Sequence, residues 1–252
     1  MNKIRNISAL QPDLAEMRRD LAATFRWFAR LGMHESVANH FSLAVGADGE
    51  NFLMNPRGIH FSRVRASDLL LLDAHDQTAL AQDSAPDPTA WFIHSAIHRR
   101  LPQARCVMHL HPKYATALAA LADSTMLPID QNTMRFFNRV AIDDGFGGMA
   151  LSSQEGDRLA KMLGSKTVLL MGNHGVLIAA PTVADAFDTM YYYERACETL
   201  ITAMSTGRPL RVAPDTVAEQ TAQEWESYGQ LGIDHLREVK AILNATEPDY
   251  CE

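Results

Sequence analysis

The stretch VMHLHPKYATALAAL, residues 107–121, joins a short apolar run to an alanine-rich segment with helical character. Two histidines, His109 and His111, stand one residue apart where the run ends. Side chains alternate between the faces of a strand, so two residues spaced in this way point to the same side, about 6.6 Å apart. Their imidazoles can then bind one metal ion through bonds of about 2.0–2.1 Å. A hydrogen-bonded pair of histidines at a strand end is the alternative interpretation.

A third histidine strengthens the metal interpretation. His174 lies in MGNHGVLIAA, residues 171–180, in a tight turn between two apolar runs. In this position the side chain faces outward from the end of a sheet and adds little to a core. His94 and His98 form a competing arrangement, because their spacing of four residues on a helix can also bind zinc. The glutamate of the H-E-x-x-H motif is absent, so we expect this second pair not to bind the ion.

Apolar spacing along the rest of the chain predicts alternating strands and helices. Strands are predicted at 41–45, 51–55, 69–74, 104–110, 166–171 and 175–180, with a short one at 139–142 in a loop-like stretch over 123–150. Helices are predicted at 13–31, 87–101, 114–122, 154–163, 182–204 and 215–243. Hairpins near both ends of the sheet exclude a strictly parallel arrangement. We therefore expect one α/β domain over residues 1–252 with a mixed, largely antiparallel central sheet. Its core covers about 14–205, and a C-terminal helix and tail follow over 215–252.

Composition limits the classes of function. With 252 residues, of which 47% are apolar, the chain is long enough to bury a stable core without disulfide bonds or structural metals. Its formal charge of −7, and the absence of any basic cluster larger than Arg99-Arg100, argue against a nucleic-acid partner. The three cysteines are too few and too far apart for a disulfide framework, which favours a reducing compartment. No signal peptide and no membrane-spanning run is recognised, so we expect a cytoplasmic protein that does not bind membranes.

Four stretches, taken in order, make the chain similar to the class II aldolase/adducin family, which includes L-fuculose-1-phosphate aldolase and metal-dependent decarboxylases. They are SVANHFSL (36–43), FLMNPRGIHFSRVRASDLLLLD (52–73), FIHSAIHRRLPQARCVMHLHPKYATAL (92–118) and TVLLMGNHGVLIAAPTVADAFDTMYYYERACE (167–198). The resemblance covers about 14–205 and implies a three-layer α/β/α fold, usually in a homotetramer. It also implies a divalent metal, Zn²⁺ or alternatively Mn²⁺, held by His109, His111 and His174.

The resemblance fails at one important position. Aldolases of this type carry a glutamate just before a tryptophan, where it binds the resting metal and acts as a general base. Counting back from His109 through Trp91 places Ala90 there, although a shifted alignment would bring Asp87 close. Aldol addition needs a base to remove a proton from carbon, whereas loss of CO₂ generates the carbanion directly. Loss of the glutamate therefore favours a decarboxylase, without excluding retro-aldol cleavage.

The resemblance also implies substrate-binding positions. Of the first phosphate-binding loop of the sugar-phosphate aldolases, the chain keeps Asn39 and Ser42. The second loop reads N-P-R-G, so that Arg57, before Gly58, stands where those enzymes have a threonine. A guanidinium can hold a carboxylate with two hydrogen bonds, which favours a substrate that carries an acid group. The alternative is that Arg57 pairs with an acidic side chain at the surface.

Three more residues complete the predicted site. Gln131 and Arg135 occupy the region where the aldolases present residues to a neighbouring subunit. Tyr250 is a candidate for taking a proton from a substrate hydroxyl, because family aldolases use a tyrosine near the C-terminus; a disordered tail is the alternative. The predicted function is a metal-dependent carbon–carbon lyase, an aldolase or decarboxylase, that acts on a small carboxylate-bearing hydroxy, keto or aromatic acid through a metal-stabilised enolate. A non-catalytic, adducin-like scaffold is the alternative.

Overall fold

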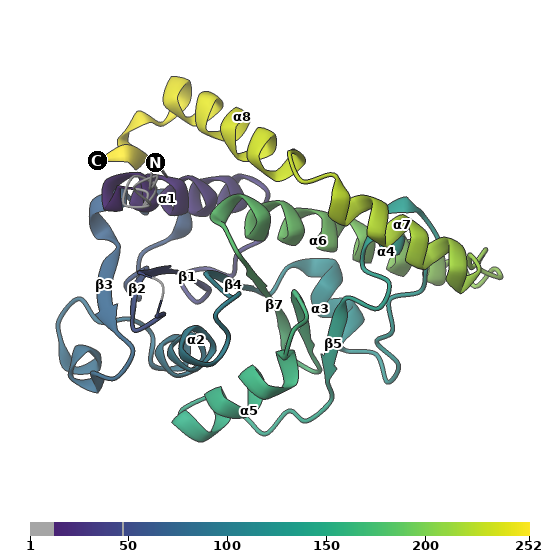
Figure 1. Ribbon diagram of the computed structural model, residues 1–252, viewed down its shortest axis with the longest axis horizontal. Helices are drawn as coiled ribbons and strands as arrows, with labels where there is room; N and C mark the ends of the chain where they lie inside the picture. The colour runs from purple at the N-terminus through teal and green to yellow at the C-terminus, as the bar shows by residue number, and fades with distance from the viewer. Residues whose placement is uncertain (1–12, 47) are drawn as a thin grey trace, which may run out of the picture.

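The computed structural model of the chain describes residues 13–46 and 48–252, so predictions for residues 1–12 and Ala47 lie outside the described part. A seven-stranded sheet crosses its centre in the order β3-β2-β1-β4-β7-β6-β5 (Figure 1). Strand β5 pairs in parallel with β6, whereas the other five pairings among the described residues are antiparallel. The predicted mixed, largely antiparallel sheet is therefore confirmed. The strands are β1 (His40–Val45), β2 (Asn51–Met54), β3 (Leu70–Asp73), β4 (Cys106–Leu110), β5 (Val140–Asp143), β6 (Val168–Met171) and β7 (Gly175–Ala180).

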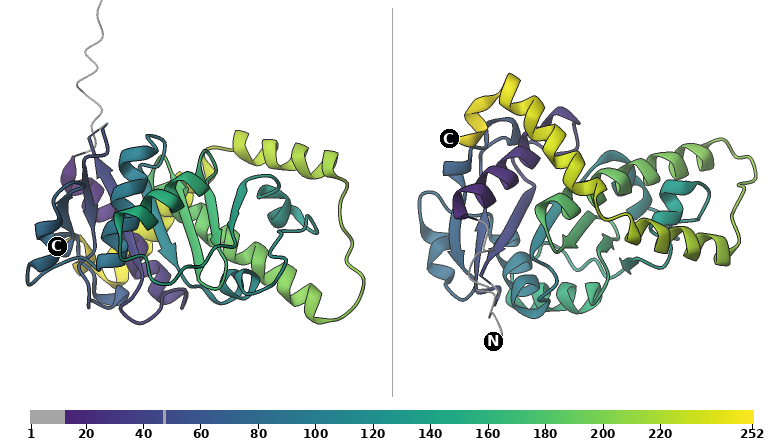
Figure 2. Two further views of the ribbon diagram at one scale, coloured as in Figure 1. Left: turned by 90° about the horizontal axis from the view of Figure 1, so that it is seen from below. Right: turned by 45° about the horizontal axis from the view of Figure 1, so that its top comes forward.

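Helices cover both faces of the sheet and give the predicted three layers (Figure 1). The larger apolar core lies between the sheet and α1, α3, α6 and α8, and a second core lies between the opposite face and α2 and α5. The remaining helices, α4 and α7, pack on each other at the end of the molecule away from β3 (Figure 2). The helices are α1 (Leu14–Arg30), α2 (Pro88–Arg100), α3 (Lys113–Ala119), α4 (Gln131–Arg135), α5 (Ser153–Leu163), α6 (Val183–Ser205), α7 (Asp215–Ser227) and α8 (Leu231–Thr246), with 3-10 helices η2 (Phe61–Arg63), η3 (Ala66–Asp68), η4 (Gln77–Ala81) and η5 (Pro248–Cys251).

Alternation along β1 and β4 decides which side chains meet α2. Phe41 and Leu43 of β1 and Met108 of β4 belong to the larger core, on the face away from α2. The side chains between them point to the α2 face, because successive residues of a strand face opposite sides. His40 stands opposite His109 in the register of these two strands. The fold thus brings two histidines from distant parts of the sequence together on the α2 face.

The stretch 123–150 differs from its prediction as a loop with one short strand. The strand is present as β5, but Gln131–Arg135 also form the short helix α4. The Asp130 carboxylate accepts a hydrogen bond from the Thr133 amide, and the Thr133 hydroxyl accepts one from the Asp130 amide. A five-residue helix is too short to show apolar periodicity, so only these caps could have revealed it.

The single helix predicted over 215–243 is wrong, because two helices stand there. Helix α7 ends at Ser227 and α8 begins at Leu231. Between them Tyr228 leaves the helical region, with φ −90° and ψ 48°. The break allows α7 to pack on α4 while α8 packs on α6 and α1. The position of the break therefore depends on the different packing partners of α7 and α8. The sequence pattern does not reveal these partners.

Two further features bear on the predictions. The three cysteines, Cys106, Cys197 and Cys251, are free thiols, and the first two are buried. Among the residues that the structure describes, no helix is both long enough and apolar enough to cross a membrane.

Candidate metal centre

The end of β4 and the turn between β6 and β7 bring three histidines together: His109, His111 and His174, called the triad below. One ring nitrogen from each lies within 4.8 Å of the others. The Nε2 atoms of His109 and His111 are 2.9 Å apart, and the His174 ring centroid lies 4.8 Å from each of the other two centroids. The three residues predicted as metal ligands are therefore neighbours in space.

In His109 and His111, the Nδ1 atoms form hydrogen bonds to oxygen atoms outside the triad, and these bonds determine which nitrogen of each ring carries the hydrogen. A carbonyl or carboxylate oxygen only accepts, so the ring nitrogen that contacts it carries the hydrogen. His109 Nδ1 donates to the Val176 carbonyl at 3.0 Å, and His111 Nδ1 donates to the Glu35 carboxylate. A neutral imidazole has one N–H, so in the neutral form of both rings the two Nε2 atoms present lone pairs to each other.

Two facing lone pairs at this distance repel unless a cation binds to both. Nitrogens bonded to one ion at about 2.0–2.1 Å lie about 2.9 Å apart at a right angle and about 3.3 Å apart at the tetrahedral angle, so the 2.9 Å between the Nε2 atoms is at the short end of this range. Burial lowers the pKa of His109 well below its usual value and that of His174 to about 4, so both rings are neutral at pH 7, as metal binding requires. The donor set fits a divalent metal ion.

The turn that carries His174 is fixed by its backbone. The Gly172 amide donates to the Asp143 carbonyl at the end of β5, and the Asn173 amide donates to the Ala119 carbonyl at the end of α3. Gly175 is required by close packing, because a Cβ there would lie 2.5 Å from Cδ2 of the His111 ring and 2.7 Å from the Leu110 carbonyl oxygen. The N-H-G motif therefore places His174 in the triad, and its second glycine leaves room for the ring of His111.

A cavity of about 400 Å³ opens beside the triad. One part of its lining is polar, with His40, Asp87 and Thr89, and another part is apolar, with Ile93, Phe146 and Met149. A larger cavity of about 830 Å³ lies between α1, α6 and α8, but it contains none of the predicted site residues. Only the smaller one joins ligand-binding nitrogens to space for a small molecule, so we regard it as the candidate active site.

Of the two predicted substrate loops, Asn39 lies in sequence between two lining residues of this cavity, whereas Arg57 and Gly58 do not line it. Asn39 is buried and accepts a hydrogen bond from the Glu35 amide at 2.7 Å, so it supports the residue that orients His111. Arg57 and Gly58 are exposed, and the Arg57 amide donates to the carbonyl of Ala85, two residues before Asp87. No acidic side chain in the described part of the chain pairs with Arg57, so its guanidinium is free to meet a ligand.

Ser42 does not line the cavity, which corrects its assignment as a substrate contact. Its side chain is fully buried, two residues further along β1 than His40. The hydroxyl lies 2.5 Å from His94 Nδ1 and 2.7 Å from His98 Nε2. His94 and His98 themselves are buried on α2 and belong to this contact, and among the described residues they are not part of the metal-type cluster.

Gln131 and Arg135 also lie away from the triad cavity within this chain. Arg135 forms an ion pair with the buried Asp188 at 2.9 Å and stacks on the rings of Tyr192 and Trp225. Gln131 accepts a hydrogen bond through its carbonyl from Trp225 Nε1 at 3.2 Å. Both residues therefore join α4 to α6 and α7, and neither contacts the cavity that holds the triad.

Tyr250 is buried in the larger core, and its proposed role as a proton acceptor at the site is not supported by its position. The hydroxyl donates to Asn244 Oδ1 at 2.9 Å, and burial raises the pKa of the phenol. The chain end that carries it packs against α1, on the face of the sheet opposite α2 (Figure 1). The tail is thus ordered, which excludes the alternative of a disordered end.

Ala90, at the position counted for the aldolase glutamate, is buried beside Phe52 and Met54 in an apolar cluster. Asp87, three residues earlier, lines the triad cavity instead and caps α2 by accepting from the Thr89 amide. Sequence reasoning also missed His40 and Glu35, because neither lies in a recognisable ligand spacing. The pairing of β1 with β4 brings these residues to the site, and no local sequence motif predicts that pairing.

The chain resembles known proteins over most of its length. The family model described as Class II Aldolase and Adducin N-terminal domain matches residues 19–201. A Caulobacter vibrioides protein named for aldolase class 2 is 31% identical over 83% of this chain and 81% of its own. Decarboxylase NovR of Streptomyces niveus is 28% identical over 90% of this chain and 84% of its own. The crystal structure of an aldolase II superfamily protein from Pseudomonas syringae, 30% identical, has a TM-score of 0.86, covering 97% of this chain and 98% of that one.

Proposed function

The chain belongs to the class II aldolase and adducin family, and on that premise we propose that it is a metal-dependent carbon–carbon lyase. Its substrate is a small carboxylate-bearing hydroxy, keto or aromatic acid. The observation that carries the proposal is the convergence of unprotonated nitrogens in the triad, where His109 and His111 face each other at 2.9 Å. In the neutral form of all three rings, which metal binding requires, a bound cation relieves the repulsion between the facing lone pairs.

The triad would hold the ion, and Zn²⁺ is the best match to an all-imidazole site, with Mn²⁺ the alternative. A bound divalent ion supplies Lewis acidity, which stabilises negative charge on a substrate oxygen when a carbon–carbon bond breaks. The protein's own contribution is orientation. The Val176 carbonyl fixes the His109 ring and the Glu35 carboxylate fixes the His111 ring, as such outer partners do in metal sites.

Two observations favour decarboxylation over aldol cleavage. The side chain of Arg57 is exposed and has no acidic partner in the described residues, and the Arg57 amide donates to the carbonyl of Ala85, two residues before the lining residue Asp87. A planar guanidinium of this kind suits a carboxylate. In addition, NovR, 28% identical to this chain, bears the name decarboxylase. The proposal extends to a cytoplasmic homotetramer, as the family resemblance implies.

Elemental analysis tests the proposal. The purified protein should carry about one equivalent of zinc or manganese per chain, and His111→Ala should carry none. His75→Ala, which removes an exposed histidine outside the site, is the matched control and should keep the metal. The loaded protein is then screened with carboxylated aldols and hydroxylated aromatic acids for release of CO₂ or of an aldehyde.

The family description also names adducin, and the second candidate function is accordingly that of a scaffold without catalysis. A scaffold does not need the metal. If the wild-type protein takes up neither zinc nor manganese when loaded with an excess of each, the lyase is rejected and the scaffold is favoured.

A further inference from the structure

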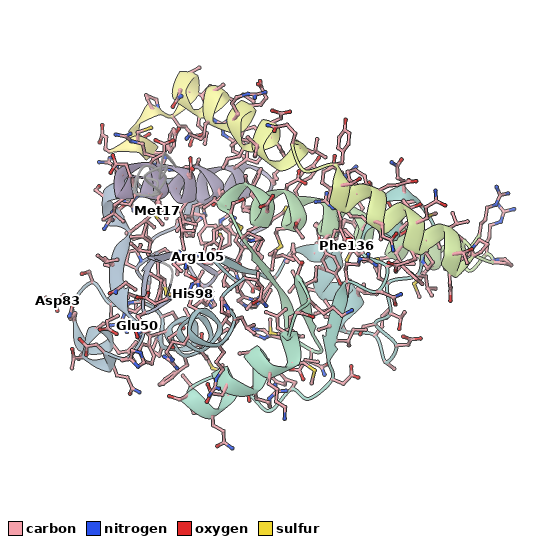
Figure 3. All side chains as sticks on the ribbon, viewed as in Figure 1. Met17, Glu50, Asp83, His98, Arg105 and Phe136 are labelled. Carbon is pink, nitrogen blue, oxygen red and sulfur yellow. The ribbon has the colours of Figure 1, made fainter. Side chains whose placement is uncertain are left out.

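A second group of histidines forms a hydrogen-bonded chain that ends at the triad cavity. It consists of His40 and Ser42 on β1 and His94 and His98 on α2, and is called the histidine chain below. All four side chains are buried, and His98 lies where α2 meets the sheet (Figure 3). The links run from the Ala104 carbonyl to His98 Nδ1 (2.9 Å), from His98 Nε2 to Ser42 Oγ (2.7 Å), from Ser42 Oγ to His94 Nδ1 (2.5 Å) and from His94 Nε2 to His40 Nδ1 (2.8 Å).

The carbonyl at one end fixes the direction of the first links. A carbonyl oxygen only accepts, so His98 Nδ1 carries the ring hydrogen. Burial lowers the pKa of His98 to about 4, so this ring is neutral at pH 7 and its Nε2 bears a lone pair. The Ser42 hydroxyl must therefore donate to His98 Nε2.

The same reasoning gives the direction of the hydrogen bonds from His94 to Ser42 and from His40 to His94. A hydroxyl has one hydrogen, and Ser42 has used it, so Ser42 Oγ accepts from His94 Nδ1. Burial also keeps His94 neutral, because it lowers the pKa of that ring well below its usual value. His94 Nε2 then accepts from His40 Nδ1, which leaves a lone pair on Nε2 of His40.

His40 belongs to the cavity lining, and because its Nδ1 is bonded to His94, Nε2 is the ring nitrogen left for a ligand. Asp87 and Thr89 lie on the same part of the lining. The Thr89 hydroxyl donates to Asp87 Oδ1 at 2.6 Å, so it has no hydrogen left for a ligand. All three side chains consequently offer acceptors, and this part of the cavity lacks a side-chain donor.

We infer that His40 Nε2 accepts a hydrogen bond from a hydroxyl of the substrate, and that Ser42, His94 and His98 are positioning residues that hold His40 in this tautomer. The inference rests on the proposed function and narrows it to an acid that also carries an alcoholic or phenolic hydroxyl. A carboxylate placed against this part of the lining would meet lone pairs and the Asp87 charge. The acid group therefore binds elsewhere, and we assign it to the exposed Arg57, whose amide is bonded to Ala85, two residues before the lining residue Asp87.

Imidazole ¹⁵N spectra of the metal-free protein test the tautomer directly. We expect His40, assigned with His40→Gln, to be protonated on Nδ1 and bare on Nε2. Ser42→Ala removes the acceptor of His94 Nδ1 and should shift His40 toward the other tautomer. Ser62→Ala removes a comparable serine–histidine contact at His60 and should leave the His40 signals unchanged. An Nε2–H tautomer in the wild-type protein overturns the inference, whether or not Ser42→Ala folds.

Binding of two small probes tests the consequence for ligands. Glycolate carries a hydroxyl, whereas methoxyacetate has the same acid group and cannot donate. For the zinc-loaded protein, calorimetry should give at least about a tenfold preference for glycolate, the effect of one hydrogen bond that the analogue leaves unmade. Ser42→Ala should lose this preference while keeping its zinc, and Ser62→Ala should retain both.

A preference that persists in Ser42→Ala would come from the metal rather than from His40, and would overturn the inference. Equal binding of the two probes by the wild-type protein would do so as well. Both outcomes leave the metal centre intact. Failure of the proposed function is seen separately, as failure to bind zinc in the elemental analysis.

Discussion

The triad and the histidine chain are neighbouring groups of three histidines, and they differ in what their hydrogen bonds leave free. In the chain, each link after the Ala104 carbonyl joins a donor to an acceptor, so only the last nitrogen, on His40, keeps an unused lone pair. In the triad, the Val176 carbonyl and the Glu35 carboxylate take the hydrogens from outside, and bare nitrogens face inward. The direction of the outer hydrogen bonds, rather than the number of histidines or their burial, thus separates a metal centre from a structural array.

The largest expected effect is on zinc binding, which is compared after one substitution in the triad and one in the histidine chain. His111→Ala removes a direct ligand and should lower zinc affinity by more than the 10- to 100-fold typical of changes to outer partners, so that no metal survives dialysis. His94→Ala removes a buried imidazole from the other group and should keep about one equivalent of zinc. Zinc content after dialysis, measured together with circular dichroism, checks both. Loss of zinc from folded His94→Ala would mean that the two groups are not separate.

The second prediction perturbs a ligand without removing it. Gly175→Ala places a Cβ 2.5 Å from Cδ2 of His111, closer than side chains pack, so the ring must move. We expect zinc affinity to fall about 100-fold or more, beyond the range for outer partners. Gly229→Ala is the matched control, because a Cβ there meets nothing within 4 Å. Competition with a chromophoric chelator gives both affinities, and an unchanged value for Gly175→Ala would count against His111 as a ligand.

A smaller effect sharpens the role of the outer hydrogen bonds. Glu35→Gln replaces the carboxylate that holds His111 Nδ1 by a neutral amide. Zinc affinity should fall about 10- to 100-fold, since such partners orient the ring and raise its basicity. Glu50→Gln changes an exposed acid on the β1–β2 turn and should have no effect. Chelator competition at pH 7.5 checks this pair, and equal affinities would show that Glu35 does not tune the site.

The fold and the triad could be predicted because their signals are local. Apolar periodicity reports whether a segment buries one face or both, and it located the strands and the long helix α6. The H-x-H spacing places two rings on one side of β4, and the N-H-G motif places the third histidine of the triad in a turn. These features need no knowledge of which segments become neighbours.

The residues around the triad could not be predicted because they depend on pairing. Glu35 reaches His111 from 76 positions away in the sequence. The face of β1 that meets α2 is fixed by its register with β4, and this register buries Ser42 rather than exposing it to the cavity. In the same way Tyr250 is held in the core by packing against distant helices. Assignments carried over from a family resemblance fail where such packing is not preserved.

The smallest prediction concerns stability and the histidine chain alone. A histidine whose pKa is lowered by folding binds fewer protons in the folded than in the unfolded state, so the free energy of unfolding falls as pH drops below the unfolded value of about 6.5. For His98, with a pKa of about 4 in the folded protein, the loss continues until about pH 4 and has a limiting slope of about 1.4 kcal/mol per pH unit.

His98→Gln keeps a polar side chain but removes this titration. Urea unfolding of the metal-free protein between pH 7 and pH 5 should therefore show a slope shallower than that of the wild type by up to about 1.4 kcal/mol per pH unit. The slope is the informative quantity, because a lost hydrogen bond lowers stability equally at every pH, whereas a lost proton-binding site changes the dependence on pH. His75→Gln, at an exposed position, should reproduce the wild-type slope. If His98→Gln also reproduces it, folding does not lower the pKa of His98, and the buried neutral ring that fixes the order of donors along the histidine chain is not supported.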